Sequence, residues 1–172
     1  GRYREFMQCD FDTIGSRCVA ADIETLLVIH DLFRAIGFDR FVIRLNNRQL
    51  LSGLLQRLGL GDRATPVLRA LDKLAKIGAD GVAEEIVRTA DASAQQAREV
   101  LKLATVTGSN DDVLRQVEPL LAGSEAGREG VARLAELIAG ARAAGVPGEA
   151  MQLDVSIARG LDYYTGTVFE TF

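Results

Sequence analysis

The sequence is poor in the residues that build metal sites and disulfide frameworks. It has two cysteines and one histidine among 172 residues. Two cysteines are too few for a disulfide framework, and no second ligand pair accompanies them for zinc, so a reducing cytosolic setting is favoured. The lone histidine, His30, has no histidine or cysteine partner at ligand spacing. We therefore interpret His30 as a packed or half-exposed structural residue.

Long apolar runs and an excess of positive charge are also missing. No run approaches the roughly 20 apolar residues that a membrane span needs, so we expect no membrane partner. The net charge of −4 argues against a strongly basic nucleic-acid surface, although it leaves room for a local one. There is no initiator methionine, and Gly1 leads directly into a strand-like pattern. We therefore expect the chain to be an excised piece of a longer protein.

Alternating residues at the two ends of the chain predict strands. Between residues 3 and 12 the odd positions are mostly apolar and the even positions are mostly charged, although a simple solvated face would also give this pattern. Apolar and polar residues alternate again from Pro147 to Ile157, which predicts a strand there. Residues 163–172 predict a further strand. We expect the terminal strands to be neighbours in one antiparallel sheet, with Gln8 near Tyr164.

Helical periodicity fills most of the sequence between these ends. A strand is predicted at 41–45 and a helix capped by Asn46 or Asn47 runs to about residue 58. The other predicted helices span residues 20–36, 64–77, 80–90, 93–105, 110–121 and 126–144. The fold class is thus α+β, with a core segment at 1–46, a mainly helical insertion at 47–148 and a second core segment at 149–172.

The polar side chains of the terminal strands could form one pocket if both strands turn the same face outward. Its members would be three arginines, an amide, carboxylates and two phenols, namely Arg2, Arg4, Arg159, Gln8, Asp10, Asp12, Tyr163 and Tyr164. Arginine forks match phosphate or carboxylate oxygens, and a carboxylate with a phenol can hold a polar ring. Such a pocket suits a ligand with an anionic end and a cationic or imidazole-like end. Gly160 is either a turn residue or a point of close ligand approach.

Two stretches of the sequence resemble a known family. Residues 1–15 read GRYREFMQCDFDTIG and residues 158–166 read ARGLDYYTG. The first resembles the second half of motif 2 of class II aminoacyl-tRNA synthetases in its histidyl-specific form, and the second resembles the histidine-binding signature of histidyl-tRNA synthetases. These two matching stretches together cover under a fifth of the chain. The helical block between them resembles the family only in its helical character. In the family, a helical insertion at this place contacts the tRNA acceptor arm.

The resemblance implies a fold, a reaction and partners. It implies a class II antiparallel sheet with flanking helices, and activation of L-histidine by ATP with Mg²⁺ to histidyl-adenylate. Transfer to the 3′ end of tRNA(His) follows. It also implies a cytoplasmic homodimer whose motif 1, motif 3 and anticodon-binding domain lie outside these residues. We therefore expect this chain alone to be inactive.

The resemblance also implies roles for the residues that bind the phosphates of ATP. Arg2 matches the motif 2 arginine near the ATP phosphates, and Arg4 lies in the same motif. Arg159 matches the arginine that lies against the α-phosphate and the histidine carboxylate, where other class II enzymes use a metal. Arg159 is thus the expected catalytic residue, and no resident metal is expected.

The remaining matches concern the histidine substrate. Gln8 matches the glutamine near its amino and carboxylate end, and Tyr163 and Tyr164 match the pair that lines the imidazole pocket. Asp12 takes the place of the acidic residue that bonds the imidazole. Many relatives have glutamate there, so this carboxylate is one methylene shorter, and the rest of the pocket or a water must close the gap.

Two alternatives from other classes of protein remain. One is a non-catalytic paralogue, such as the regulatory subunit of ATP phosphoribosyltransferase. Such proteins do not keep the intact RGLDYY motif, which is complete in this sequence. The other is a module that binds an RNA arm through its helical block. That block, residues 47–147, has 13 basic and 13 acidic residues, which gives the RNA alternative little support. Salt-dependent RNA binding by the chain would favour it.

Overall fold

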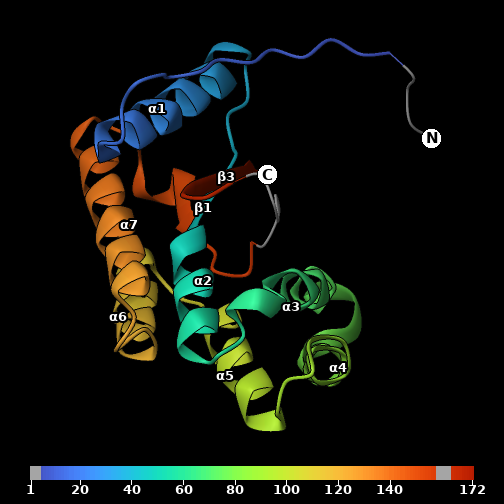
Figure 1. Cartoon of the computed structure of the whole chain (residues 1–172). Helices are drawn as coiled ribbons and strands as arrows, with labels where there is room; N and C mark the ends of the chain where they lie inside the picture. Colours follow the sequence, from blue (N-terminus) through green and yellow to red (C-terminus); the bar gives the residue numbers. More distant parts are fainter. Residues whose placement is uncertain (1–4, 158–163) are drawn as a thin grey trace.

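The protein is an α+β structure in which helices surround a small sheet (Figure 1). The computed structural model describes residues 5–157 and 164–172. The strands are β1 Ile43–Asn47, β2 Met151–Leu153 and β3 Thr167–Thr171. The α-helices are α1 Val19–Ala35, α2 Arg48–Arg57, α3 Ala64–Leu71, α4 Leu74–Ala90, α5 Ala94–Ala104, α6 Asn110–Leu120 and α7 Glu125–Ala143, with short 3-10 helices at Gly61–Arg63 and Gly148–Ala150.

Polar caps fix where several helices begin. Asn47 accepts a hydrogen bond from the backbone N–H of Gln49 at 2.9 Å, which confirms it as the cap of α2. Ser93, Ser109 and Ser124 cap α5, α6 and α7 in the same way. Each such bond satisfies a backbone donor that a helix start leaves unpaired. The side chains of this region therefore select the boundaries that the sequence predicts.

The segment between residues 64 and 90 is divided differently from the prediction. The helix expected at 64–77 ends at Leu71, and α4 begins at Leu74 and runs on to Ala90. Gly78, inside α4, has φ of 71°, a left-handed value that only glycine adopts readily, and it kinks the helix. The break expected near residue 78 is thus present as a sharp kink at Gly78, where two helical stretches within Leu74–Ala90 meet.

The sheet is mixed, with strand order β2-β1-β3. β1 pairs antiparallel with β3, and it pairs parallel with β2. The predicted α+β fold class is confirmed, and one of the two pairings in the described sheet is parallel rather than antiparallel. A parallel pair needs a long crossover, and here the chain from α2 to α7 supplies it.

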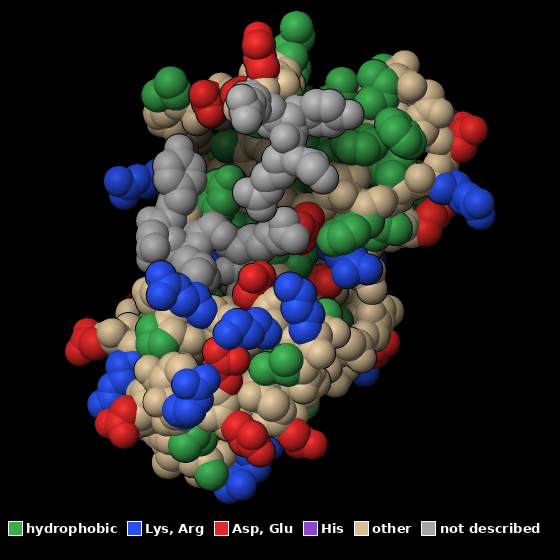
Figure 2. All heavy atoms as spheres, turned by 90° about the vertical axis from the view of Figure 1, so that its right-hand side faces the viewer, with side chains coloured by type: hydrophobic (Ala, Val, Ile, Leu, Met, Phe, Trp, Pro, Cys, Tyr) green, Lys and Arg blue, Asp and Glu red, His purple; other side chains and the backbone are tan. Residues whose placement is uncertain are grey.

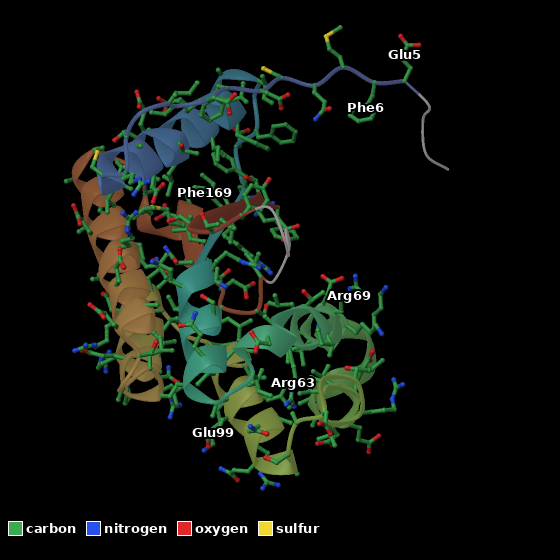
Figure 3. The ribbon with its side chains drawn as sticks, in the orientation of Figure 1. Glu5, Phe6, Arg63, Arg69, Glu99 and Phe169 are labelled. Carbon is green, nitrogen blue, oxygen red and sulfur yellow. The ribbon has the colours of Figure 1, made fainter. Side chains whose placement is uncertain are left out.

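The N-terminal segment does not join this sheet. Residues 5–14 form neither helix nor strand and are exposed, with Met7 97% accessible. Figure 1 shows them running along the outside of α1, and Figure 3 places Glu5 and Phe6 well away from Phe169 of β3. The predicted pairing of the two terminal strands is wrong for the described residues, because residues 5–14 form no strand and β3, an edge strand of the sheet, pairs there only with β1. An extended segment becomes a strand only when a neighbour pairs its backbone groups.

The core lies between α7, the sheet and the two helices that pack against α7, which are α1 and α2. Leu26 of α1, Leu45 of β1 and Leu137 of α7 are fully buried there. Glycines let α7 approach its neighbours closely, since a Cβ at Gly130 would meet Leu50 of α2 and one at Gly140 would meet Ile23 of α1. This packing joins the sheet, α1 and the central helices into one continuous apolar cluster.

Candidate functional site

Two hollows adjoin the residues that flank segment 158–163. One, of about 340 Å³, is lined by Ile157, Tyr164 and residues 167–170. The other, of about 310 Å³, lies between the end of β2 and the α3–α4 junction, with Arg44, Asp154 and Ser156 in its wall. They share Ile157 and Glu170. Figure 2 shows basic and acidic side chains close together near the middle of the face in view.

A tight turn carries the chain from β2 into this region. The Asp154 backbone N–H donates to the Leu45 carbonyl at 2.9 Å, which extends the ladder with β1 by one bond. The Asp154 carboxylate accepts the backbone N–H of Ser156 at 3.0 Å and the hydroxyl of Ser156 at 2.5 Å. A side chain that bonds its own backbone two residues on is a common turn-former. Asp154 therefore sets the direction in which the chain approaches Ile157.

Arg44 joins this turn to the end of β3. Its Nη1 donates to the Asp154 carboxylate at 3.0 Å, and its guanidinium lies 4.4 Å from the ring centroid of Phe172. Arg44 and Asp154 are 39% and 20% exposed, so the pair is only partly desolvated. Planar guanidinium groups stack on aromatic faces while they bond carboxylates. Arg44 thus ties the two outer strands together across β1.

A second polar network ties the start of β3 to helices α1 and α7. The Thr167 hydroxyl donates to the Asp22 carboxylate of α1 at 2.7 Å. Arg133 of α7 lies 3.9 Å from the same carboxylate and donates to the Arg17 carbonyl at 2.6 Å. The start of β3 is therefore held to both α1 and α7.

The residues predicted for the site fall into three groups. Arg2, Arg4, Arg159 and Tyr163 lie outside the residues that the structure describes. Gln8 and Asp12 lie in the exposed N-terminal segment. Tyr164 lines the hollow beside β3 and is 52% exposed. The structure does not bring Gln8 and Asp12 together with Tyr164, because the N-terminal segment runs outside α1 (Figure 1).

The polar residues around the signature were not predicted as part of the site. Sequence reasoning identified Asn46 and Asn47 only as candidate helix caps, and it gave no role to Arg44, Asp154 or Thr167. Two adjacent asparagines at the end of an apolar strand were the available signal, because buried amides require specific hydrogen-bond partners. The partners themselves are over 100 residues away in the chain, so no local pattern identifies them.

The described residues contain neither a candidate metal-binding cluster nor a helix that could span a membrane. Within residues 5–157 and 164–172, no group of three or more His, Cys, Asp or Glu side chains is arranged to hold a metal ion. In the same ranges, no helix has both the length and the apolar character of a transmembrane span.

The fold is shared with solved synthetases. The structure is similar to the crystal structure of histidyl-tRNA synthetase from Nostoc sp. PCC 7120, with a TM-score of 0.82 and 34% identity over 91% of this chain and 37% of that one. It also shares its fold with a Bacillus halodurans protein described as an ATP phosphoribosyltransferase regulatory subunit/histidyl-tRNA synthetase, at a TM-score of 0.75 and 21% identity, covering 92% of this chain and 40% of that one. The architecture is therefore that of an aminoacyl-tRNA synthetase or a relative of one.

Sequence comparison defines the family. The family described as Histidyl-tRNA synthetase matches residues 1–172, the whole chain. This chain is 53% identical to the histidine–tRNA ligase of Rhodopirellula baltica and 38% identical to that of Gloeobacter violaceus. Each comparison covers 99% of this chain. The protein belongs to the histidyl-tRNA synthetase family. It spans about two fifths of the length of these relatives, 39% and 37%.

Proposed function

We propose that this chain forms part of the catalytic domain of a histidine–tRNA ligase. The enzyme would activate L-histidine with ATP to histidyl-adenylate and pass the histidyl group to tRNA(His). The observation that carries this proposal is the complete ARGLDYYTG segment at 158–166 within a chain that matches its family from end to end. We further propose that the enzyme is a cytoplasmic class II homodimer.

The proposed first step is an in-line substitution at phosphorus. A carboxylate oxygen of histidine attacks the α-phosphorus of ATP, the bond to the bridging oxygen breaks, and pyrophosphate leaves. Mg²⁺ enters as the ion bound to ATP rather than as a resident cofactor. A hydroxyl of the terminal ribose of tRNA then attacks the carbonyl carbon of the adenylate, and AMP leaves.

We assign the charge stabilisation in this step to arginines. Arg159 would lie against the α-phosphate, where negative charge develops as the new bond forms. Arg2 and Arg4 would hold the ATP phosphates. A guanidinium keeps its charge at any physiological pH and presents a fixed fork of donors, so it can stabilise the transition state without exchanging a proton.

We assign substrate selection to a carboxylate, an amide and two phenols. Asp12 would accept the imidazole N–H, Tyr163 and Tyr164 would line the ring, and Gln8 would contact the amino and carboxylate end of the substrate. A buried carboxylate rejects ligands that cannot donate to it, because its own charge would be left unpaired. The N-terminal segment would have to move from its position outside α1 to bring Gln8 and Asp12 to the signature.

A non-catalytic regulatory subunit is the second candidate. The Bacillus halodurans structure supports it at the level of fold alone. A regulatory subunit would lack histidine-dependent exchange of pyrophosphate into ATP, whereas a ligase would catalyse it. This reaction separates the two candidates without a need for tRNA.

Two variants of the complete gene product that contains residues 1–172 test the assigned roles. Arg159→Ala should lower kcat for pyrophosphate exchange by roughly 10²–10³-fold, as removal of other oxyanion donors does. Asp12→Asn should impair histidine activation and leave ATP binding nearly intact, whereas Asp12→Glu should be tolerated better because it keeps the charge with a longer reach.

Arg98→Ala is the matched control, because Arg98 is an exposed arginine on α5 whose side chain bonds only its helix neighbour Gln95 among the contacts described. Exchange by this variant should equal that of the wild type. Normal turnover in Arg159→Ala with only a raised KM for histidine would reduce Arg159 to a binding residue. If Asp12→Asn matches the wild type, Asp12 does not bond the imidazole ring.

A further inference from the structure

We propose that Asp22 is a positioning residue for the histidine pocket: it accepts the hydroxyl of Thr167, stops the start of β3 from fraying and so keeps Tyr164 in place. This inference rests on the proposed function, because it takes Tyr164 as a wall of that pocket. Asp22 lies in the first turn of α1 and is not among the described residues that line the hollow beside β3. It therefore acts through Thr167 rather than by contact with a ligand.

Thr167 and Tyr164 belong to the same wall. Both line the hollow of about 340 Å³ beside β3. Thr167 is the first residue of β3, and it pairs with Asn47, the last residue of β1. Tyr164 precedes Thr167 by three residues and lies ahead of the strand. The place of Tyr164 in the wall thus depends on how firmly the first residue of β3 is held.

The sheet holds the start of β3 from one side. In the described sheet β3 is an edge strand that pairs with β1. The backbone N–H of Arg48 donates to the Gly166 carbonyl at 2.9 Å. The Asn47 side chain reaches the Thr167 hydroxyl at 3.4 Å, which is a long and weak hydrogen bond. The end of a strand opens more easily than its middle, so a further side-chain anchor has a large effect at this point.

Asp22 supplies that anchor from the helix layer. The Thr167 hydroxyl donates to the Asp22 carboxylate at 2.7 Å. A hydrogen bond to a charged acceptor at this distance is roughly twice as strong as a neutral one. Arg133 of α7 lies 3.9 Å from the same carboxylate, and it also donates to the Arg17 carbonyl at 2.6 Å. Asp22 is therefore a braced acceptor, with α1 carrying it and α7 beside it.

Two substitutions remove this hydrogen bond from opposite sides. Asp22→Ala removes the acceptor, and Thr167→Val removes the donor while it keeps the branched shape of the side chain. Thr167→Ser keeps the hydroxyl and is the rescue variant. Asp112→Ala is the matched control, because Asp112 of α6 also accepts a hydroxyl, that of Ser109 at 2.6 Å. If Asp22→Ala does not fold, the comparison of Thr167→Val with Thr167→Ser carries the test.

The first readout is hydrogen exchange of the backbone amides of residues 164–172 in this chain, which requires no activity. We expect Asp22→Ala and Thr167→Val to speed it by roughly 10-fold, as the loss of one such hydrogen bond does. Thr167→Ser and Asp112→Ala should exchange as the wild type does. The double variant Asp22→Ala/Thr167→Val should exchange no faster than either single variant, because both remove the same bond. Additive effects, or wild-type exchange in Asp22→Ala and Thr167→Val, would overturn the anchor.

The second readout is the KM for histidine in pyrophosphate exchange by the complete gene product. We expect Asp22→Ala and Thr167→Val to raise it by roughly 10-fold, with the KM for ATP unchanged. Thr167→Ser and Asp112→Ala should keep both wild-type KM values. A merely structural role would lower the apparent kcat through loss of folded enzyme and leave both KM values as they are.

That result for Asp22→Ala, or a rise in KM shared equally by ATP, would overturn the positioning role. A wild-type enzyme without histidine-dependent pyrophosphate exchange would refute the proposed function instead. The hydrogen-exchange comparison would then decide by itself whether Asp22 holds the start of β3.

Discussion

Gly53→Ala should destabilise the protein, although the same change in an ordinary helix stabilises it. Gly53 lies in α2, where an added Cβ would overlap the Ser124 hydroxyl and sit 2.7 Å from the backbone nitrogen of Gly127 in α7. Alanine gains about 1 kcal/mol of helix propensity over glycine. Overpacking against a backbone costs about 1–3 kcal/mol. Displacing Ser124, which caps α7, costs about 1 kcal/mol more.

The net effect is a loss of about 1–3 kcal/mol, and each kcal/mol lowers Tm by about 2–4 °C in a domain of this size. Thermal unfolding followed by helical circular dichroism measures it. Gly148→Ala is the control, because a Cβ at Gly148 meets no atom within 4 Å. That variant should keep or slightly raise the Tm. A Tm for Gly53→Ala above that of the wild type would refute the close approach of α2 and α7.

Two further predictions concern stability. The Ser109 hydroxyl, which donates to the Asp112 carboxylate at 2.6 Å, lowers the pKa of Asp112 below its usual value of 3.8; this stabilisation is therefore present at neutral pH and is lost as the pH falls through the lowered pKa. Asp112→Asn should remove that part of the acid dependence of Tm, and identical pH profiles would contradict the assignment. Leu137→Ala, in the fully buried centre of α7, should cost about 2–5 kcal/mol of unfolding free energy in urea. Leu32→Ala on the exposed face of α1 should change it by under about 0.5 kcal/mol, and equal losses would contradict the packing described.

Much of the helical part of the fold could be predicted from the sequence, because its signals are local. Asn47 as the cap of α2 is confirmed, and Gly37 and Gly59, both with positive φ, follow the ends of α1 and α2 close to the predicted helix ends at residues 36 and 58. The sequence also predicts β1, although the strand begins two residues later than expected. A cap or a terminating glycine acts within a few residues, so its effect is visible in a short window of sequence.

The sheet was predicted less well, because pairing depends on residues far apart in the chain. Alternation at residues 3–12 resembles a strand, but alternation alone does not name a partner, and residues 5–14 have no place in the sheet described. The parallel pairing of β1 with β2 depends on the crossover through the six α-helices and two 3-10 helices between them, which no local pattern encodes. The hydrogen-bond acceptors of the Asn46 side chain, which are the carbonyls of Val155 and Ile157, could not be predicted for the same reason.

We propose that this sequence belongs to an enzyme that activates histidine. The most direct measurement is amino-acid-dependent exchange of labelled pyrophosphate into ATP by the complete gene product, with each of the standard amino acids supplied singly. We expect exchange with histidine and none above background with the other amino acids. Exchange that is absent with histidine, or that is equally fast with another amino acid, would contradict it.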